Sequence, residues 1–142
     1  MYKKEKEYFM GLDNGICIKR NEYSNKIKIL SKYAESYDTQ KIYDFEICYW
    51  RKCWNVRRDI FQVINAEEDS MYRFNLDIYD IKEILKVLKS YNEKNWEYGG
   101  YGSIWEWSEH KNVNRKHIKN LKVLIKLMKK YPELEVYFYD SY

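Results

Sequence analysis

The chain has 142 residues, of which 45% are hydrophobic and 34% charged, and its formal net charge is +4 at pH 7. This length suits one domain with a buried core, and the balance of apolar and charged residues excludes a disordered chain. No run approaches the roughly 18 apolar residues of a transmembrane helix, and the first residues lack the apolar stretch of a secretory signal. We therefore expect a charged leader over 1–9 and a single cytoplasmic domain over 10–142, with no membrane partner.

The first half of the chain predicts strands followed by a helix. Period-two alternation predicts strands over 17–20, 26–30 and 43–50, and residues 21–25 suit a hairpin connection between the first two. Residues 10–16 contain Asp-Asn-Gly, which is typical of a turn. After the third strand, apolar residues recur at helical spacing and predict a buried stripe. These residues are Cys53, Val56, Ile60, Val63 and Ile64.

The next segment predicts a short strand, a capped helix and a long loop. The strand is expected over 72–76, and Asp77 or Asp80 would cap the helix that follows. An aromatic loop is expected over 93–109. The helix before it has an apolar stripe made of Ile81, Ile84, Leu85, Leu88 and Tyr91.

The C-terminal segment predicts a long helix and a last strand. The helix is expected from about residue 112 to residue 130, where Tyr131 and Pro132 end it. Residues 135–139 predict the terminal strand. Together these elements predict an α+β fold, in which about three helices pack on one face of a small antiparallel sheet.

Neither a metal centre nor a cofactor site is indicated by the sequence. Cys17, Cys48 and Cys53 form no Cys-x-x-Cys pair, and His110 and His117 are the only histidines. A structural zinc site needs four closely spaced ligands, which these residues do not supply. We therefore expect free thiols in a reducing cytosol, and neither metal nor cofactor.

Basic residues concentrate in two segments. Residues 51–58 hold four basic groups and no acid, and residues 111–130 hold eight and no acid. Such segments suit a surface that binds phosphate, and they also suit an ordinary solvated surface.

The first of these segments combines arginine with tryptophan. On a helical wheel Arg57 lies near the edge of the apolar stripe, whereas Arg51 and Arg58 point away from it, and all three are candidate ligand contacts. Arg57 either extends to solvent or grips a phosphate with two hydrogen bonds where the helix meets the sheet. Trp50 and Trp54 flank the same stretch and offer flat faces on which a base can stack, so this pattern favours a nucleotide ligand.

Other candidate contacts lie on the second and third helices and in the loop between them. Asn92 continues an apolar stripe, so we expect it to point inward, either to satisfy terminal carbonyls or to read a base edge. Asn114 and His117 fall on the inward face of the last helix, where Asn114 suits a capping role. The loop around Tyr101 is interpreted either as a lid over a planar ligand or as a surface buried by oligomerisation.

Catalytic motifs are scarce. The sequence has no Gly-x-Ser-x-Gly, no His-Glu-x-x-His and no Gly-Lys-Ser/Thr ending of a phosphate-binding loop. We therefore expect binding rather than catalysis.

Three segments resemble a known group of proteins: residues 11–16 (Gly-Leu-Asp-Asn-Gly-Ile), 46–55 (Glu-Ile-Cys-Tyr-Trp-Arg-Lys-Cys-Trp-Asn) and 137–142 (Tyr-Phe-Tyr-Asp-Ser-Tyr). They are similar to a widespread group of small phage and prophage proteins and, within it, to the first family of Thoeris anti-defence proteins. Asn14 of the opening segment and Arg57 after the Tyr-Trp-Arg-Lys segment are then candidate ligand contacts.

The resemblance implies a sponge for signalling nucleotides. Such a protein binds a cyclic ADP-ribose isomer without cleaving it and so blocks the TIR-derived signal in an infected or lysogenic bacterial host. It also implies a homo-oligomer, either a dimer or an assembly of dimers, and in some members cyclic oligonucleotides at separate sites. Two alternatives remain open: a nucleic-acid-binding protein that uses the basic last helix, and an inhibitor of a host protein that uses the aromatic loop.

Overall fold

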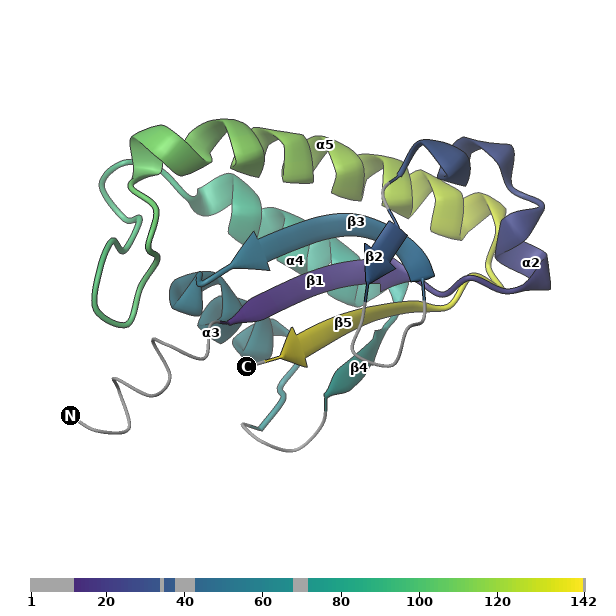
Figure 1. Cartoon of the computed structure of the whole chain (residues 1–142), viewed down its shortest axis with the longest axis horizontal. Coiled ribbons are helices and arrows are strands. Elements are labelled where there is room, and N and C mark those ends of the chain that lie inside the picture. The colour runs from purple at the N-terminus through teal and green to yellow at the C-terminus, as the bar shows by residue number, and fades with distance from the viewer. Residues whose placement is uncertain (1–11, 34, 38–42, 68–71, 142) are drawn as a thin grey trace.

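The fold is built on a five-stranded antiparallel sheet with the strand order β2-β3-β1-β5-β4 (Figure 1). The computed structural model describes residues 12–33, 35–37, 43–67 and 72–141, so the predicted leader over 1–9 lies outside the described residues. The strands are β1 (Asp13–Ile18), β2 (Glu35–Tyr37), β3 (Tyr43–Arg51), β4 (Arg73–Leu76) and β5 (Val136–Ser141).

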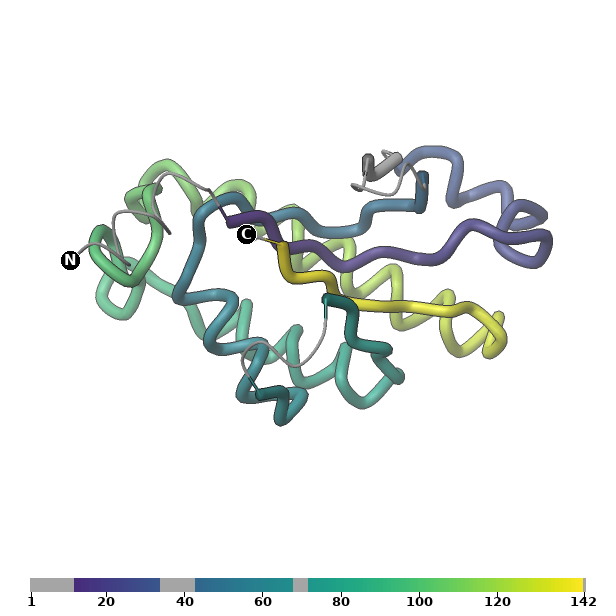
Figure 2. Tube along the Cα trace, turned by 60° about the horizontal axis from the view of Figure 1, so that its bottom comes forward, coloured from purple at the N-terminus to yellow at the C-terminus, as the bar shows by residue number. Residues whose placement is uncertain are grey.

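Three main helices lie on one side of this sheet, and α5 runs along β3 (Figures 1 and 2). The core forms where the inward side chains of the strands meet these helices, among them the fully buried Ile16, Trp50 and Phe138. The predicted α+β class is therefore confirmed. The helices are α2 (Glu22–Asn25), the 3-10 helix η1 (Lys28–Lys32), α3 (Trp54–Val63), α4 (Ile78–Ser90) and α5 (Trp107–Lys130).

The strand predicted over 26–30 is wrong, and so is the hairpin before it. Asn21 caps α2, because its side chain accepts a hydrogen bond from the backbone N–H of Ser24 while the Ser24 hydroxyl accepts one from the backbone of Asn21. This reciprocal cap favours a helical turn. Ile27 and Leu30 are buried three residues apart, a spacing that a helical turn also satisfies.

The turn expected at Asp-Asn-Gly is also wrong, because these residues lie within β1. The Asn14 amide donates a hydrogen bond of 2.8 Å to Asp140 on β5, so the tertiary partner replaces the local turn. Gly15 is needed for a close approach: a Cβ there would lie 2.4 Å from the ring of Tyr139 on the paired strand.

The helix caps were partly foreseeable. Asp77 is the N-cap of α4 and forms a capping box with Asp80, which confirms the prediction. In contrast, α5 begins at Trp107, five residues before the predicted start, because Glu106 and Glu109 form a capping box there. Asn114 is consequently inside the helix, and its Nδ2 donates to the carbonyl oxygen of Leu88 at 2.9 Å instead of capping.

Two further observations concern cysteines and membranes. The three cysteines are buried and form no disulfide. Among the helices in the described ranges, none combines the length and the apolarity that crossing a bilayer requires.

Candidate functional site

The second half of β3 is a sheet edge that α5 covers. Among the described residues β2 pairs with residues 43–45 of β3, and farther along β3 side chains of α5 bond to its backbone. The Asn120 amide donates to the carbonyl oxygen of Ile47 at 3.0 Å, and the backbone N–H of Tyr49 donates to His117 Nε2 at 3.4 Å. Polar residues on the inward face of α5 therefore satisfy a backbone edge that would otherwise be open to pairing.

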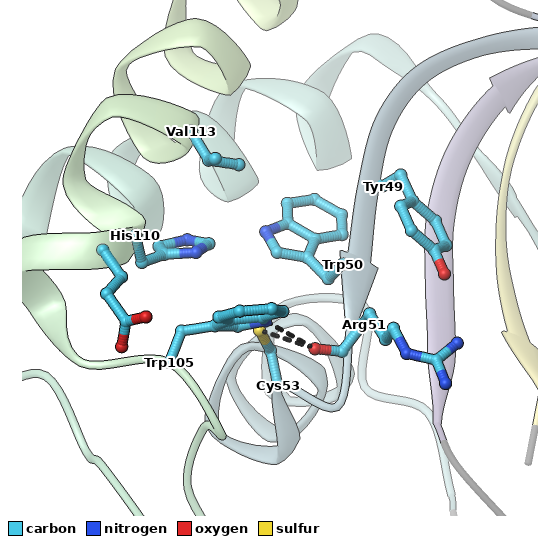
Figure 3. A pocket seen from close by; sticks show the side chains of 8 residues that line it. Tyr49, Trp50, Arg51, Cys53, Trp105, His110 and Val113 are labelled. Carbon is cyan, nitrogen blue, oxygen red and sulfur yellow. Dashed lines mark hydrogen bonds between the residues drawn. The ribbon is translucent and has the colours of Figure 1, made fainter.

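A pocket of about 390 Å³ opens where β3 ends, between α5 and the loop before it. We call it the aromatic pocket. The N-terminal end of α5 supplies one wall, and the end of β3 supplies the other (Figure 3). Its lining residues are Tyr49, Trp50, Arg51, Cys53, Trp105, Glu109, His110 and Val113.

Two ring nitrogens at this pocket lack a hydrogen-bond partner among the described residues. They are Nε1 of Trp50 and Nε2 of His110, in side chains that are only 1% and 4% exposed. The nitrogen side of the Trp50 indole faces the His110 ring (Figure 3). Both atoms are closed off from solvent, so they lie inside the wall of the pocket and would reach an occupant only if their side chains moved.

Trp105 is a fixed wall of the pocket. Its indole Nε1 donates to the carbonyl oxygen of Arg51 at 3.1 Å, and its backbone N–H donates to the Ser103 hydroxyl at 2.9 Å. Its own carbonyl oxygen accepts a hydrogen bond from Trp96 Nε1 at 2.8 Å. Trp105 is nevertheless 38% exposed, so the pocket presents an accessible aromatic surface whose position is already set.

The two histidines behind the pocket are uncharged at neutral pH. Burial lowers the pKa of His110 to about 4. Burial, together with nearby His110 and Lys116, lowers the pKa of His117 to about 3. The His110 ring also stacks on Trp96 with a centroid distance of 4.4 Å. The pocket wall is thus mostly aromatic and uncharged, with the carboxylate of Glu109 beside it, and it suits a planar ring better than a bare anion.

The sequence predicted two of the residues that line the pocket, Trp50 and Arg51. Trp50 lines it, but its side chain is only 1% exposed and packs in the core, so the flat faces on which we expected a base to stack are covered. Arg51 contributes its backbone, whereas its guanidinium points away from Trp105 (Figure 3) and lies 3.7 Å from the Asp13 carboxylate. The charged group predicted beside Trp50 is therefore on the other side of the strand.

Arg57 is part of a buried ion pair. Its Nε and Nη2 bind the two carboxylate oxygens of Asp140 at 2.8 and 2.9 Å, and its side chain is 4% exposed. Asn14 donates to the same carboxylate, and Trp54 lies 5.4 Å from the guanidinium. The expectation that Arg57 extends to solvent is wrong, and the two-pronged grip predicted for a phosphate is made with Asp140.

The remaining predicted residues lie outside the aromatic pocket. Asn92 was expected to point inward, which is wrong: it follows α4, is exposed, and accepts hydrogen bonds from the backbone N–H groups of Lys94 and Asn95. Arg58 is exposed and pairs with Asp59 and Glu97. Tyr101 is 70% exposed.

Sequence reasoning missed His110, Trp105 and Val113 as pocket residues. His110, Asn114 and His117 recur at intervals of four and three residues, which places them on one helical face. That signal was available once the start of the helix was moved to Trp107.

The fold and the site define a small α+β domain with a preformed aromatic pocket at a sheet edge. In the described ranges, no three histidine, cysteine or acidic side chains gather where they could hold a metal ion. Comparison with protein-family models, curated proteins and solved structures finds no match to this chain. Statements about function therefore depend on the geometry of the site and on the sequence motifs.

Proposed function

We propose that this chain binds a cyclic ADP-ribose-type signalling nucleotide and holds it without cleaving it, as a phage or prophage anti-defence protein that withholds the signal from Thoeris immunity. The observation that carries this proposal is the aromatic pocket, with the exposed face of Trp105 as a surface on which a base can stack. A purine has flat faces that stack on such a ring and edges that donate and accept hydrogen bonds. The identity of the signal comes from the motif resemblance.

The dimensions of the pocket support a ligand of this kind. About 390 Å³ lies within the range of roughly 300–1,000 Å³ that small-molecule sites occupy. Sequestration requires affinity of the order of nanomolar, about −12 kcal/mol. The proposal includes a homo-oligomer, in which a second copy covers the exposed Trp105 and Val113 and closes the open side of the pocket.

A second candidate function is nucleic-acid binding through α5. All eight basic residues of the segment 111–130 are exposed, and none forms a salt bridge with a residue that the structure describes. Such a surface would bind phosphate backbones with a strong dependence on salt. The alternative of host-protein inhibition is favoured by the exposed Tyr98 and Tyr101.

The test is ligand capture followed by recovery. The purified protein is incubated with cyclic ADP-ribose isomers and with cyclic di- and trinucleotides, and its melting temperature is compared with that of the free protein. The ligand is then released by heat, and its mass is measured by mass spectrometry. Because His110 and Glu109 both line the pocket and could transfer protons, recovery of the intact ligand is the result that separates binding from hydrolysis.

We expect one cyclic ADP-ribose isomer to raise the melting temperature and to be recovered unchanged. Recovery of a cleaved product would make the chain an enzyme. If nothing in the panel stabilises the protein but a labelled oligonucleotide shifts at low salt, the second candidate replaces the first.

A further inference from the structure

A second hollow, of about 580 Å³, adjoins the aromatic pocket along α5. We call it the lysine hollow. It lies between η1, β3 and α5, and three lysines from two separate elements surround it. Four of its lining residues matter most. They are Lys32, the last residue of η1, and Lys116, Lys119 and Asn120 on α5.

The charges around the lysine hollow are mostly positive. All three lysines are exposed, and none forms a salt bridge with a carboxylate in the part of the chain that the structure describes. Glu46 also lines the hollow, but its carboxylate accepts a hydrogen bond from the Tyr139 hydroxyl at 3.2 Å. Three lysines around one hollow, two from α5 and one from η1, suit a phosphate or diphosphate group.

The two hollows are neighbours along β3 and α5. Tyr49 and Val113 line both of them, so a ligand that passes over these two residues reaches the aromatic end and the lysine end. An α-helix rises about 1.5 Å per residue, so Lys116, six positions after His110, lies about 9 Å farther along the helix axis. A nucleoside places a sugar between its base and its phosphates, and this spacing accommodates such an arrangement.

We propose that the lysine hollow binds the phosphate groups of a nucleotide whose base occupies the aromatic pocket. This inference rests on the proposed function and deepens it, because it assigns the base and the phosphates of one ligand to two neighbouring hollows. Lys116 and Lys119 contact the phosphates from α5, and Lys32 contacts them from η1. Arg57 has no part in phosphate binding.

The experiment compares adenosine with ADP as probes, using isothermal titration calorimetry. The test variant is Lys116→Gln/Lys119→Gln, which removes two charges from the hollow. The matched control is Lys126→Gln/Lys129→Gln, which removes two charges from exposed positions of the same helix that do not line the hollow. Both variants have the same net charge, so any difference between them reports position.

We expect the wild-type chain to bind ADP at least about tenfold more tightly than adenosine. The test variant should lose this preference while its affinity for adenosine stays unchanged, and the control variant should keep most of it. Raising the salt concentration should weaken ADP binding and leave adenosine binding unaffected, because screening acts on charge pairs.

Each other outcome overturns a specific statement. If the test variant keeps the wild-type preference for ADP, the lysine hollow is not the phosphate site, while the proposed function stands. If the control variant loses as much as the test variant, the overall charge of α5 is responsible, as in nucleic-acid binding. If the wild-type chain binds neither probe and none of the cyclic ADP-ribose isomers, the proposed function itself fails.

Discussion

The imidazole Nε2 of His117 accepts a hydrogen bond from the backbone N–H of Tyr49 at a donor–acceptor distance of 3.4 Å. A helix side chain thus occupies a place that a neighbouring strand would take in a larger sheet. This relationship accounts for the change from polar to apolar residues along the buried face of α5. Its inward face is polar at His110, Asn114 and His117, where it meets the pocket and the strand edge, and apolar from Leu121 onward.

Removing the acceptor at position 117 should destabilise the fold. His117→Leu leaves the partly buried Tyr49 N–H without its acceptor, and because an unsatisfied buried donor costs about 1–3 kcal/mol, we expect a loss near the lower end of that range. His117→Gln retains a side-chain acceptor and should cost less. Urea unfolding measures both free energies, and equal losses in the two variants would show that the hydrogen bond contributes nothing.

The two buried histidines should make stability fall in mild acid. Burial lowers the pKa of His110 to about 4 and that of His117 to about 3, whereas an unfolded histidine has a pKa of about 6.5. Below this pH the unfolded chain binds protons that the folded chain does not. The stability is therefore complete above pH 6.5 and is lost as the pH falls toward 4, with a slope approaching about 1.4 kcal/mol per pH unit for each histidine.

Urea midpoints between pH 7.5 and pH 5 measure this loss. The variant His117→Gln removes one of the two titrating groups and should show about half the slope in this range. A variant with the wild-type slope would mean that other groups cause the pH dependence.

Much of the fold could be predicted because its signals are local. The patterns that predicted β3, α3 and the cap at Asp77 each lie within about ten residues, and the structure confirms the strand, the helix and the cap. In α3 the buried apolar face differs in part, because Phe61 belongs to it and Val63 is only half-buried. The segment over 26–30 failed because five residues are too few to separate a strand from a helical turn. The capping pair Asn21 and Ser24 decided the segment before it, where a helical turn replaces the predicted hairpin.

The site was harder to predict because its contacts join distant segments. The partner of Arg57 is Asp140, which lies 83 residues away on the last strand, and no local pattern predicts this pair. Trp105 reaches the pocket by bonding the Arg51 carbonyl 54 residues earlier. Trp50 was identified by its residue type and its neighbours, whereas the direction of Arg51 depended on the register of β3 with β1.

The pair of Arg57 and Asp140 should be essential for folding. Asp140→Leu leaves a buried guanidinium without its carboxylate, and breaking a buried pair by removing one partner costs about 3–5 kcal/mol. The double variant Arg57→Met/Asp140→Leu removes both charges and should recover a large part of this loss. Chemical unfolding of the wild type, both single variants and the double variant gives the coupling energy.

A coupling energy near zero would contradict the structural role of this pair. An Arg57→Met variant with wild-type stability and weakened ADP binding would contradict it too, because that result would make Arg57 a ligand contact.

Trp105 should be the residue whose loss weakens ligand binding most selectively. It is 38% exposed and forms one wall of the aromatic pocket, so Trp105→Ala removes a stacking surface without emptying the core. Stacking of a base on an aromatic ring contributes about 1–3 kcal/mol, which corresponds to a loss of roughly 5- to 150-fold in affinity. Calorimetry with adenosine measures this loss directly, since adenosine lacks the phosphates that the lysine hollow would bind.

Two companion variants separate stacking from the other contacts of this side chain. Trp105→Phe keeps a ring but loses the hydrogen bond to the Arg51 carbonyl, so it should retain more affinity than Trp105→Ala. Tyr79→Ala removes an aromatic ring that is 72% exposed on α4 and does not line the pocket, and it should bind adenosine like the wild type. If Tyr79→Ala and Trp105→Ala weaken binding equally, the base does not stack in the aromatic pocket.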